Sequence, residues 1–147
     1  MSQRAPLIAA AFDEVSRWRA DSGSTSDQAV RALLAAYPPD RVADLLWADL
    51  PESVSTTDVA DLLSLWTWRT DDNGASIMRT MERWIDECAD SRKVAVALNL
   101  DAYPFVDHRL RLARLKLLAA RFPEHRSRCE SMIDATKLMM QRDCERG

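Results

Sequence analysis

Three carboxylates at helical spacing are the first residues in this sequence that can do chemistry. Glu82, Asp86 and Asp90 follow one another at intervals of four residues, which places them on one side of a helix. Such a row can hold a divalent cation or take part in general acid–base catalysis. Metal sites in helical bundles also need a histidine three residues after a glutamate, and the sequence has no such pair. We interpret the row as a solvated face or as an acidic stripe that binds a protein.

Histidine and cysteine are sparse. His125 and Cys129 are spaced so that two ligands from one helix can share a metal, but no second pair at matching spacing completes a site. No Cys/His pair with a supporting Asn or Asp is recognisable for nucleophilic catalysis. We therefore predict no metal, no cofactor and no catalytic residue, and we expect that the protein is not an enzyme. A helical enzyme whose site assembles from scattered residues such as Glu82, Asp86 and His108 stays an alternative.

Basic residues gather toward the end of the chain. Between His108 and Arg128 there are seven Arg or Lys and a single acidic residue. Arg111, Arg114 and Arg121 share an arc of about 80° on a helix, and such a patch can contact phosphates. The chain is acidic overall, with a net charge of −3, and shows no helix-turn-helix or RNA-binding motif. A nucleic-acid-associated regulator is therefore an alternative, and ion pairing within the molecule or with a second copy, as in a homodimer, is favoured.

Tryptophan is the most unusual feature of the composition. The five tryptophans are Trp18, Trp47, Trp66, Trp68 and Trp84. Trp66 and Trp68 differ by about 200° around a helix, so they cannot both point into one small core. We expect at least one of the two to be partly exposed, and exposed tryptophan is typical of binding hot spots. The alternative, that all five lie in the core or at its boundary, stays open.

Charge is divided unevenly along the chain. Acidic residues outnumber basic ones by 17 to 10 as far as Phe105, whereas basic residues outnumber acidic ones by 10 to 6 from Val106 onward. We expect a protein-binding surface on the acidic part, which also carries every tryptophan. The candidate contact residues are Asp44, Trp47, Asp61, Trp66, Trp68, Asp71, Asp72, Glu82, Asp86 and Asp90.

The elements that must position these residues are helices. Only three glycines occur in 147 residues, too few for the turns of a β-sandwich or the phosphate loop of a Rossmann domain. Apolar residues recur at helical spacing in about eight segments. Ser26 and Ser55 are predicted to cap helices, with Asp58 at capping-box spacing from Ser55. Segment 94–100 alternates like a strand but has no partner strand, so we expect a short helix. The sequence thus predicts one all-α domain over 1–147 with seven or eight helices.

Segment 105–122 is predicted to be a long central helix. Val106, Leu110, Ala113, Leu117 and Ala120 form one apolar arc, and Leu112, Leu115, Leu118, Ala119 and Phe122 form a second, roughly opposite one. A helix with two apolar faces is expected to be covered on both. The sequence Val-Ala-Asp-Leu-Leu occurs at 42–46 and again at 59–63, seventeen residues later. This spacing is compatible with stacked hairpins of the HEAT or TPR kind, and an irregular bundle is the other possibility.

Cysteine usage and hydropathy bear on location. The three cysteines form no C-x-x-C, which indicates a reducing compartment, and no apolar stretch is long enough for a membrane span. We expect a cytoplasmic protein. Arginine greatly outnumbers lysine, as in proteins from GC-rich genomes. A small acidic helical protein of this kind fits a bacterial immunity protein or antitoxin. It would inhibit a toxin or effector by covering its basic cleft with the acidic faces around Asp44, Asp61 and 82–90.

Overall fold

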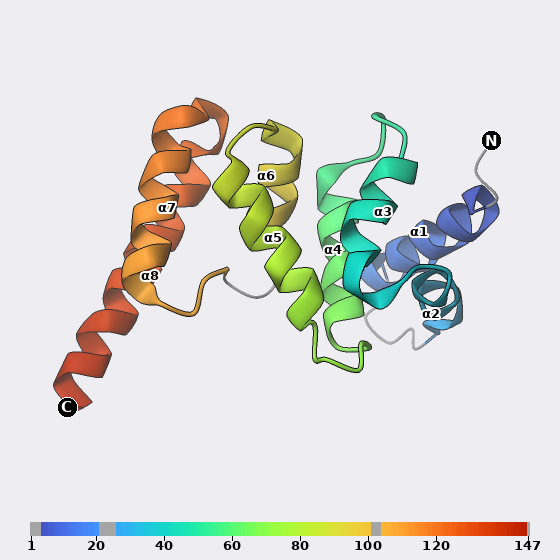
Figure 1. The fold of residues 1–147 in the computed structure, drawn as a ribbon, viewed down its shortest axis with the longest axis horizontal. Helices are drawn as coiled ribbons and strands as arrows, with labels where there is room; N and C mark the ends of the chain where they lie inside the picture. Colours follow the sequence, from blue (N-terminus) through green and yellow to red (C-terminus); the bar gives the residue numbers. More distant parts are fainter. Residues whose placement is uncertain (1–3, 21–25, 101–103, 147) are drawn as a thin grey trace. The chain divides into compact units, whose positions relative to one another are not determined.

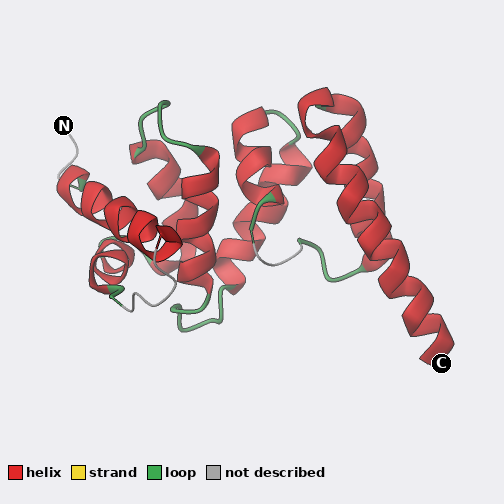
Figure 2. Ribbon diagram, turned by 180° about the vertical axis from the view of Figure 1, so that it is seen from behind, coloured by secondary structure: helices red, strands yellow, loops and turns green. Residues whose placement is uncertain are grey.

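The computed structural model describes residues 4–20, 26–100 and 104–146, and in these ranges the chain is helix and loop without strands (Figures 1 and 2). Helix, with the 3-10 helices included, accounts for 78% of the described residues. The eight α-helices are α1 (Ala5–Ala20), α2 (Gln28–Ala35), α3 (Val42–Asp49), α4 (Thr56–Thr67), α5 (Ala75–Glu87), α6 (Ser91–Leu98), α7 (His108–Arg121) and α8 (Arg126–Arg146). Two short 3-10 helices, Pro39–Arg41 and Pro123–His125, precede α3 and α8. The predicted all-α class and helix number are confirmed.

The helices belong to two compact units. The first comprises Met1–Thr80 with Asn99–Asp101, and the second comprises Met81–Leu98 with Ala102–Gly147. The division falls within α5, so the beginning of that helix belongs to the first unit and its end to the second. The single domain expected over 1–147 stays a prediction.

In the first unit, α2 is capped by a residue of another helix. We expected Ser26 to be the cap, but α2 begins at Gln28 and the side chain at its N-cap position makes no capping bond. The carboxylate of Glu14 in α1 accepts the backbone N–H groups of Val30 at 2.9 Å and Ala29 at 3.3 Å. The Ser26 hydroxyl donates to the same carboxylate at 3.1 Å. Glu14 is almost completely buried, and it joins α1 to the start of α2.

Helix α4 begins as predicted. The Ser55 hydroxyl accepts the N–H of Thr57 at 3.2 Å, so Ser55 is the cap. Asp58, expected at the capping-box position, instead pairs with Arg19 of α1 at 2.8 Å. The acidic residue of the predicted box therefore also helps to hold α1 beside α4.

The turn between α4 and α5 depends on left-handed backbone. Asn73 and Gly74 have φ angles of 56° and 80°, and a Cβ atom on Gly74 would lie 2.7 Å from the Cβ of Thr67. The Gly74 N–H donates to the Thr70 hydroxyl at 2.6 Å and to the carboxylate of Asp72 at 3.1 Å. Glycine is therefore required here by both conformation and space.

In the second unit, α7 and α8 form an antiparallel hairpin, and the two helices lie side by side in both views (Figures 1 and 2). Helix α8 buries Cys129, Met132, Ile133 and Thr136. The ambiguous segment 94–100 is helical as far as Leu98, which confirms the expected short helix.

Helix α7 corrects one expectation. The arc that contains Leu115, Leu118 and Phe122 is buried. The opposite arc is not: Leu110 is 39% exposed, Leu117 57% exposed, and Val106, just before the helix, 93% exposed. The expectation that both apolar faces are covered is therefore wrong. A helix in a hairpin buries only the face toward its partner, and α8 covers one side of α7.

Candidate protein-binding surface

The two tryptophans at the end of α4 have opposite environments. Trp66 is 0% exposed, and its indole N–H donates to the carbonyl of Val30 at 2.9 Å. Trp68, the C-cap residue just after α4, is 81% exposed. Because residues two apart lie on nearly opposite sides of a helix, the burial of Trp66 leaves Trp68 outside. The expectation that at least one of this pair is exposed is confirmed, and Trp66 is removed from the predicted contact residues because it has no accessible surface.

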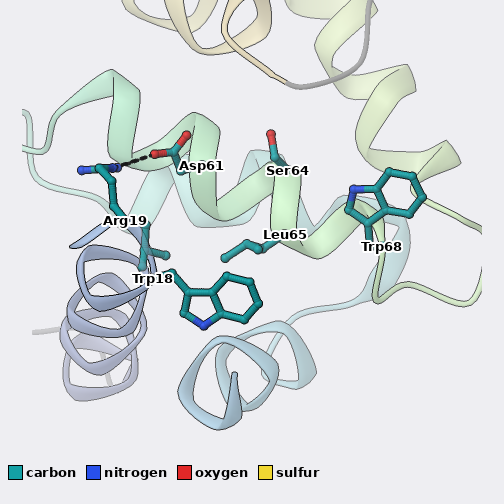
Figure 3. A pocket seen from close by; sticks show the side chains of 7 residues that line it. Trp18, Arg19, Asp61, Ser64, Leu65 and Trp68 are labelled. Atoms are coloured by element: carbon teal, nitrogen blue, oxygen red, sulfur yellow. Dashed lines mark hydrogen bonds and ion pairs between the residues drawn. The ribbon is translucent and has the colours of Figure 1, made fainter. Parts of the chain in front are cut away.

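Trp68 borders a pocket between α1 and α4, with a volume of about 280 Å³ (Figure 3). We call this the Trp68 pocket, and it is lined by Val15, Trp18, Arg19, Asp61, Ser64, Leu65 and Trp68. In Figure 3, Leu65 lies between the two indoles, and the Arg19–Asp61 ion pair lies at the end away from Trp68. The pocket thus has an apolar part at Trp18 and Leu65 and a charged end.

The charged end is held by an ion-pair cluster. Arg19 pairs with both Asp61 and Asp58, the latter at 2.8 Å. Hydrogen bonds that the Arg19 guanidinium donates to Asp61 and then to Asp58 raise its pKa. Two carboxylates share one cation here, so this end of the Trp68 pocket keeps a net negative charge. Asp61, one of the predicted contact residues, therefore lies in the pocket.

Trp18 is fixed in place by its neighbours. Its indole N–H donates to the carbonyl of Ser26 at 2.6 Å. The guanidinium of Arg69 lies 5.6 Å from the centre of the Trp18 ring, a cation–π distance. Arg69 is itself held by Asp27 at 2.6 Å. The apolar part of the Trp68 pocket is therefore ordered before any partner arrives.

A second pocket of about 440 Å³ lies on the first unit, and Arg69, the residue after Trp68, lines it. We call it the Tyr37 pocket, and its lining is Arg31, Leu34, Ala35, Tyr37, Pro39, Arg69, Thr70, Asp71 and Asp72. Asp71 and Asp72, both predicted contact residues, are exposed here. Asp72 also caps α5, because its carboxylate accepts the hydroxyl of Ser76 at 2.7 Å and its N–H at 3.0 Å. These hydrogen bonds lower the pKa of Asp72 from 3.8 to about 2.

The other predicted residues of the first unit lie elsewhere. Asp44 and Trp47 are half-buried on α3 and line neither the Trp68 pocket nor the Tyr37 pocket. Of the predicted contact residues on this unit, Asp61, Trp68, Asp71 and Asp72 thus line one or other of the two pockets.

The acidic row predicted on one side of a helix is broken, because α5 ends at Glu87 and Asp90 lies beyond it. All three carboxylates are used within the second unit. Glu82 accepts the N–H of Phe105 at 3.1 Å, and Asp86 pairs with Arg114 at 2.5 Å. Asp90 caps α6, accepting the N–H groups of the second and third residues of that helix at 2.9 and 3.3 Å. The three carboxylates therefore point to three different partners. Among the described residues, no group of three or more His, Cys, Asp or Glu side chains lies close enough to hold a metal ion.

The three arginines of the predicted nucleic-acid patch do not form one surface. Arg111 is almost completely buried and donates to the carbonyls of Pro104 at 3.0 Å and Phe105 at 2.8 Å. This is a correction, because a guanidinium that faces α8 and the loop before α7 cannot reach a phosphate. Arg114 is held by Asp86 as described above, and Arg121 is exposed.

Sequence reasoning missed a cluster formed by Ser91, Glu124 and His125. The Ser91 hydroxyl donates to Glu124 at 2.8 Å, and the Nε2 atom of His125 lies 3.0 Å from both the hydroxyl and the carbonyl oxygen of Ser91. In a catalytic triad the carboxylate orients the histidine from its other nitrogen, whereas here it contacts the serine. The cluster therefore connects α6 to the turn before α8. No spacing signal in the sequence joins residues more than thirty positions apart.

Two further residues that the sequence offered for chemistry, Cys129 and His108, are not placed for catalysis. Cys129 is fully buried, and burial raises the pKa of its thiol to about 11. A thiol in that state is protonated and unreactive. His108 lines a different pocket from Asp86, so the scattered acid–base residues do not share one pocket.

Within the described ranges, no helix has the length and apolarity needed to cross a membrane. Comparisons with protein-family models, with curated proteins and with solved structures find no match for this chain. What the protein does is therefore inferred from its own surface.

Proposed function

We propose that this protein binds another protein through Trp68 and the pocket beside it, and that it inhibits its partner by covering a functional surface, as immunity proteins and antitoxins do. The single observation that carries the proposal is the exposure of Trp68, 81%, next to a partly apolar pocket, whereas the other large apolar side chains in the described part of the chain are mostly buried.

The energetics of binding favour such a residue. A tryptophan presents a large rigid surface with few rotatable bonds, so its desolvation on binding costs little conformational entropy. The neighbouring Trp18 is held by Ser26 and Arg69. A partner side chain that enters the Trp68 pocket therefore meets a surface that is already ordered, which lowers the cost of association.

Charge indicates the kind of partner. The linings of the two pockets balance three aspartates, Asp61, Asp71 and Asp72, against three arginines, Arg19, Arg31 and Arg69. Asp58 and Asp27, which pair with these arginines, bring the two pockets and their borders to a net negative charge. Acidic surfaces attract basic partners and speed their association. A toxin or effector whose substrate cleft is basic fits this surface. The proposed setting is the cytoplasm, where the three free cysteines would stay reduced.

Co-expression tests the proposal. The product of the neighbouring gene is expressed in a bacterial host with the wild-type protein, with Trp68→Ala, or with the control Leu138→Ala, which removes an exposed leucine of α8. We expect the wild type and Leu138→Ala to relieve growth arrest and to co-purify with the partner, and Trp68→Ala to do neither. Failure of the wild-type protein to bind, or full protection by Trp68→Ala, would contradict the proposal.

A further inference from the structure

The exposed arc of α7 has the spacing of a coiled-coil contact. Leu110, Ala113, Leu117 and Ala120 are separated by three, four and three residues, the alternation of the a and d positions of a heptad. All four are exposed. We call these four residues the α7 seam. Val106 extends the same spacing by one position before the helix begins.

The residues that flank the α7 seam are all cationic. Arg109 and Lys116 occupy the positions just before each leucine, and Arg114 and Arg121 the positions just after each alanine. These are the g and e positions, which set partner choice in coiled coils. Helix α7 contains no acidic residue at all. An apolar stripe with cationic side chains on both sides is therefore presented on this 14-residue helix, and one of the four cations, Arg114, is already paired with Asp86.

A pocket adjoins the middle of the α7 seam. Its volume is about 310 Å³, and Leu117 lines it together with Ile85, Asp86, Cys88 and Arg114. The Arg114–Asp86 ion pair lies at this pocket. An apolar side chain from a helix laid along the α7 seam can enter here, as in helix-in-groove recognition.

We infer that the α7 seam is a docking site for an amphipathic helix of a partner protein, with acidic residues on both sides of its apolar stripe. A second copy of α7 does not fit, because cations would face cations whether the two helices ran parallel or antiparallel. Like charges across an interface disfavour a pairing, and opposite charges select it. Phosphate backbones are also anionic, but they offer nothing to cover the exposed leucines. This surface is separate from the Trp68 pocket and differs from it in charge, so the inference goes beyond the proposed function.

Two labelled synthetic peptides test the inference by fluorescence anisotropy. Both have three heptads with leucine at a and d; one carries glutamate at e and g, and the other carries lysine. A third peptide has the acidic composition in scrambled order, which abolishes the apolar stripe. We expect saturable binding of the acidic amphipathic peptide, at least tenfold weaker binding of the other two, and weaker binding at high salt.

Variants of exposed residues locate the site. Leu117→Ser is expected to weaken binding of the acidic peptide at least tenfold, whereas Leu138→Ser on α8 and Trp68→Ala leave it unchanged. Arg109→Glu combined with Lys116→Glu should shift the preference to the lysine peptide. Circular dichroism checks that each variant remains folded.

The inference is overturned by any of four results. These are equal binding of the ordered and scrambled acidic peptides, no effect of Leu117→Ser, binding of a 20-base-pair DNA duplex as tight as that of the acidic peptide, or concentration-dependent self-association without peptide binding. Because Trp68→Ala is expected to leave peptide binding intact, failure of this site and failure of the Trp68 surface can be distinguished.

Discussion

At Gly74 the absence of a Cβ atom is important for stability. Its φ of 80° lies in the left-handed region, and an added Cβ would come within 2.7 Å of the Thr67 Cβ. We predict that Gly74→Ala lowers the free energy of unfolding by about 1–3 kcal/mol, since strain and steric conflict act together. Urea denaturation measures the change. The matched control is Asn73→Gly, which should be neutral or slightly stabilising because Asn73 has a φ of 56°. Equal destabilisation by both changes would contradict this account of the turn.

Glu14 is a buried carboxylate whose removal should be costly. A glutamine there can accept only through one oxygen and brings two N–H donors toward the donors of α2. We predict that Glu14→Gln lowers the free energy of unfolding by about 1–3 kcal/mol. Asp13→Asn is the control, because Asp13 is exposed and pairs along its own helix with Arg17. It should change stability by less than about 0.5 kcal/mol. A Glu14→Gln protein as stable as Asp13→Asn would show that this cap is not needed.

Asp72 makes the stability of the fold depend on pH between about pH 4 and pH 2. Its pKa falls from 3.8 to about 2 in the folded protein, so its carboxylate stabilises the fold above the unfolded value and loses that effect as the pH falls toward 2. Thermal melts should therefore show the wild type above Asp72→Asn at pH 6, and a difference in melting temperature that shrinks between pH 4 and pH 2. A difference that is independent of pH would exclude the capping carboxylate as its cause.

At the scale of elements, Arg111 joins three parts of the second unit. From α7 it reaches the carbonyls of Pro104 and Phe105 and, at 3.4 Å, the hydroxyl of Thr136 in α8. Phe105 has a φ of 60°, and its N–H is bound by Glu82. Arg111 therefore binds the carbonyl of Phe105 and Glu82 binds its N–H, on either side of a strained backbone conformation.

Replacing Arg111 should therefore weaken the second unit. We predict that Arg111→Met lowers the free energy of unfolding by about 2–4 kcal/mol, because buried carbonyls lose their donors. Its neighbour Arg109 is exposed, and Arg109→Met should change stability by less than about 0.5 kcal/mol. Chemical denaturation of the two variants decides the matter, and similar stabilities would contradict the assigned role of Arg111.

The helices themselves were predictable from sequence, because apolar periodicity and caps act within a few residues. Ser55 and the short helix in 94–100 are examples. Contacts between distant residues were not predictable: nothing in the spacing of Glu14 or Arg111 says that another helix will cover it. The wrong expectation for α7 has the same cause, because the sequence shows two apolar arcs but does not show which of them the hairpin buries. For the candidate surface, helical geometry indicated that Trp66 and Trp68 differ, but not which of them is buried.

At the scale of the whole molecule, charge is distributed unevenly along the chain. As a result, the candidate surface on the first unit is acidic and the one on the second unit is basic. The first unit carries the exposed Trp68 with Asp61, Asp71 and Asp72 around its pockets. The second unit carries the α7 seam with its basic flanks. Each surface has an apolar centre and charged borders, which is the composition of protein contacts. The proposed inhibitor function concerns the first, and the helix-docking inference concerns the second.

The central claim is that Trp68 anchors a protein partner, and the dissociation constant of that complex tests it most directly. Surface plasmon resonance with the purified partner compares the wild type, Trp68→Ala and the control Leu138→Ala. A hot-spot tryptophan is worth about 2 kcal/mol or more, which corresponds to a roughly 30-fold increase in Kd for Trp68→Ala. We predict that increase, with Leu138→Ala unchanged. A Trp68→Ala protein that binds within twofold of the wild type would contradict the account.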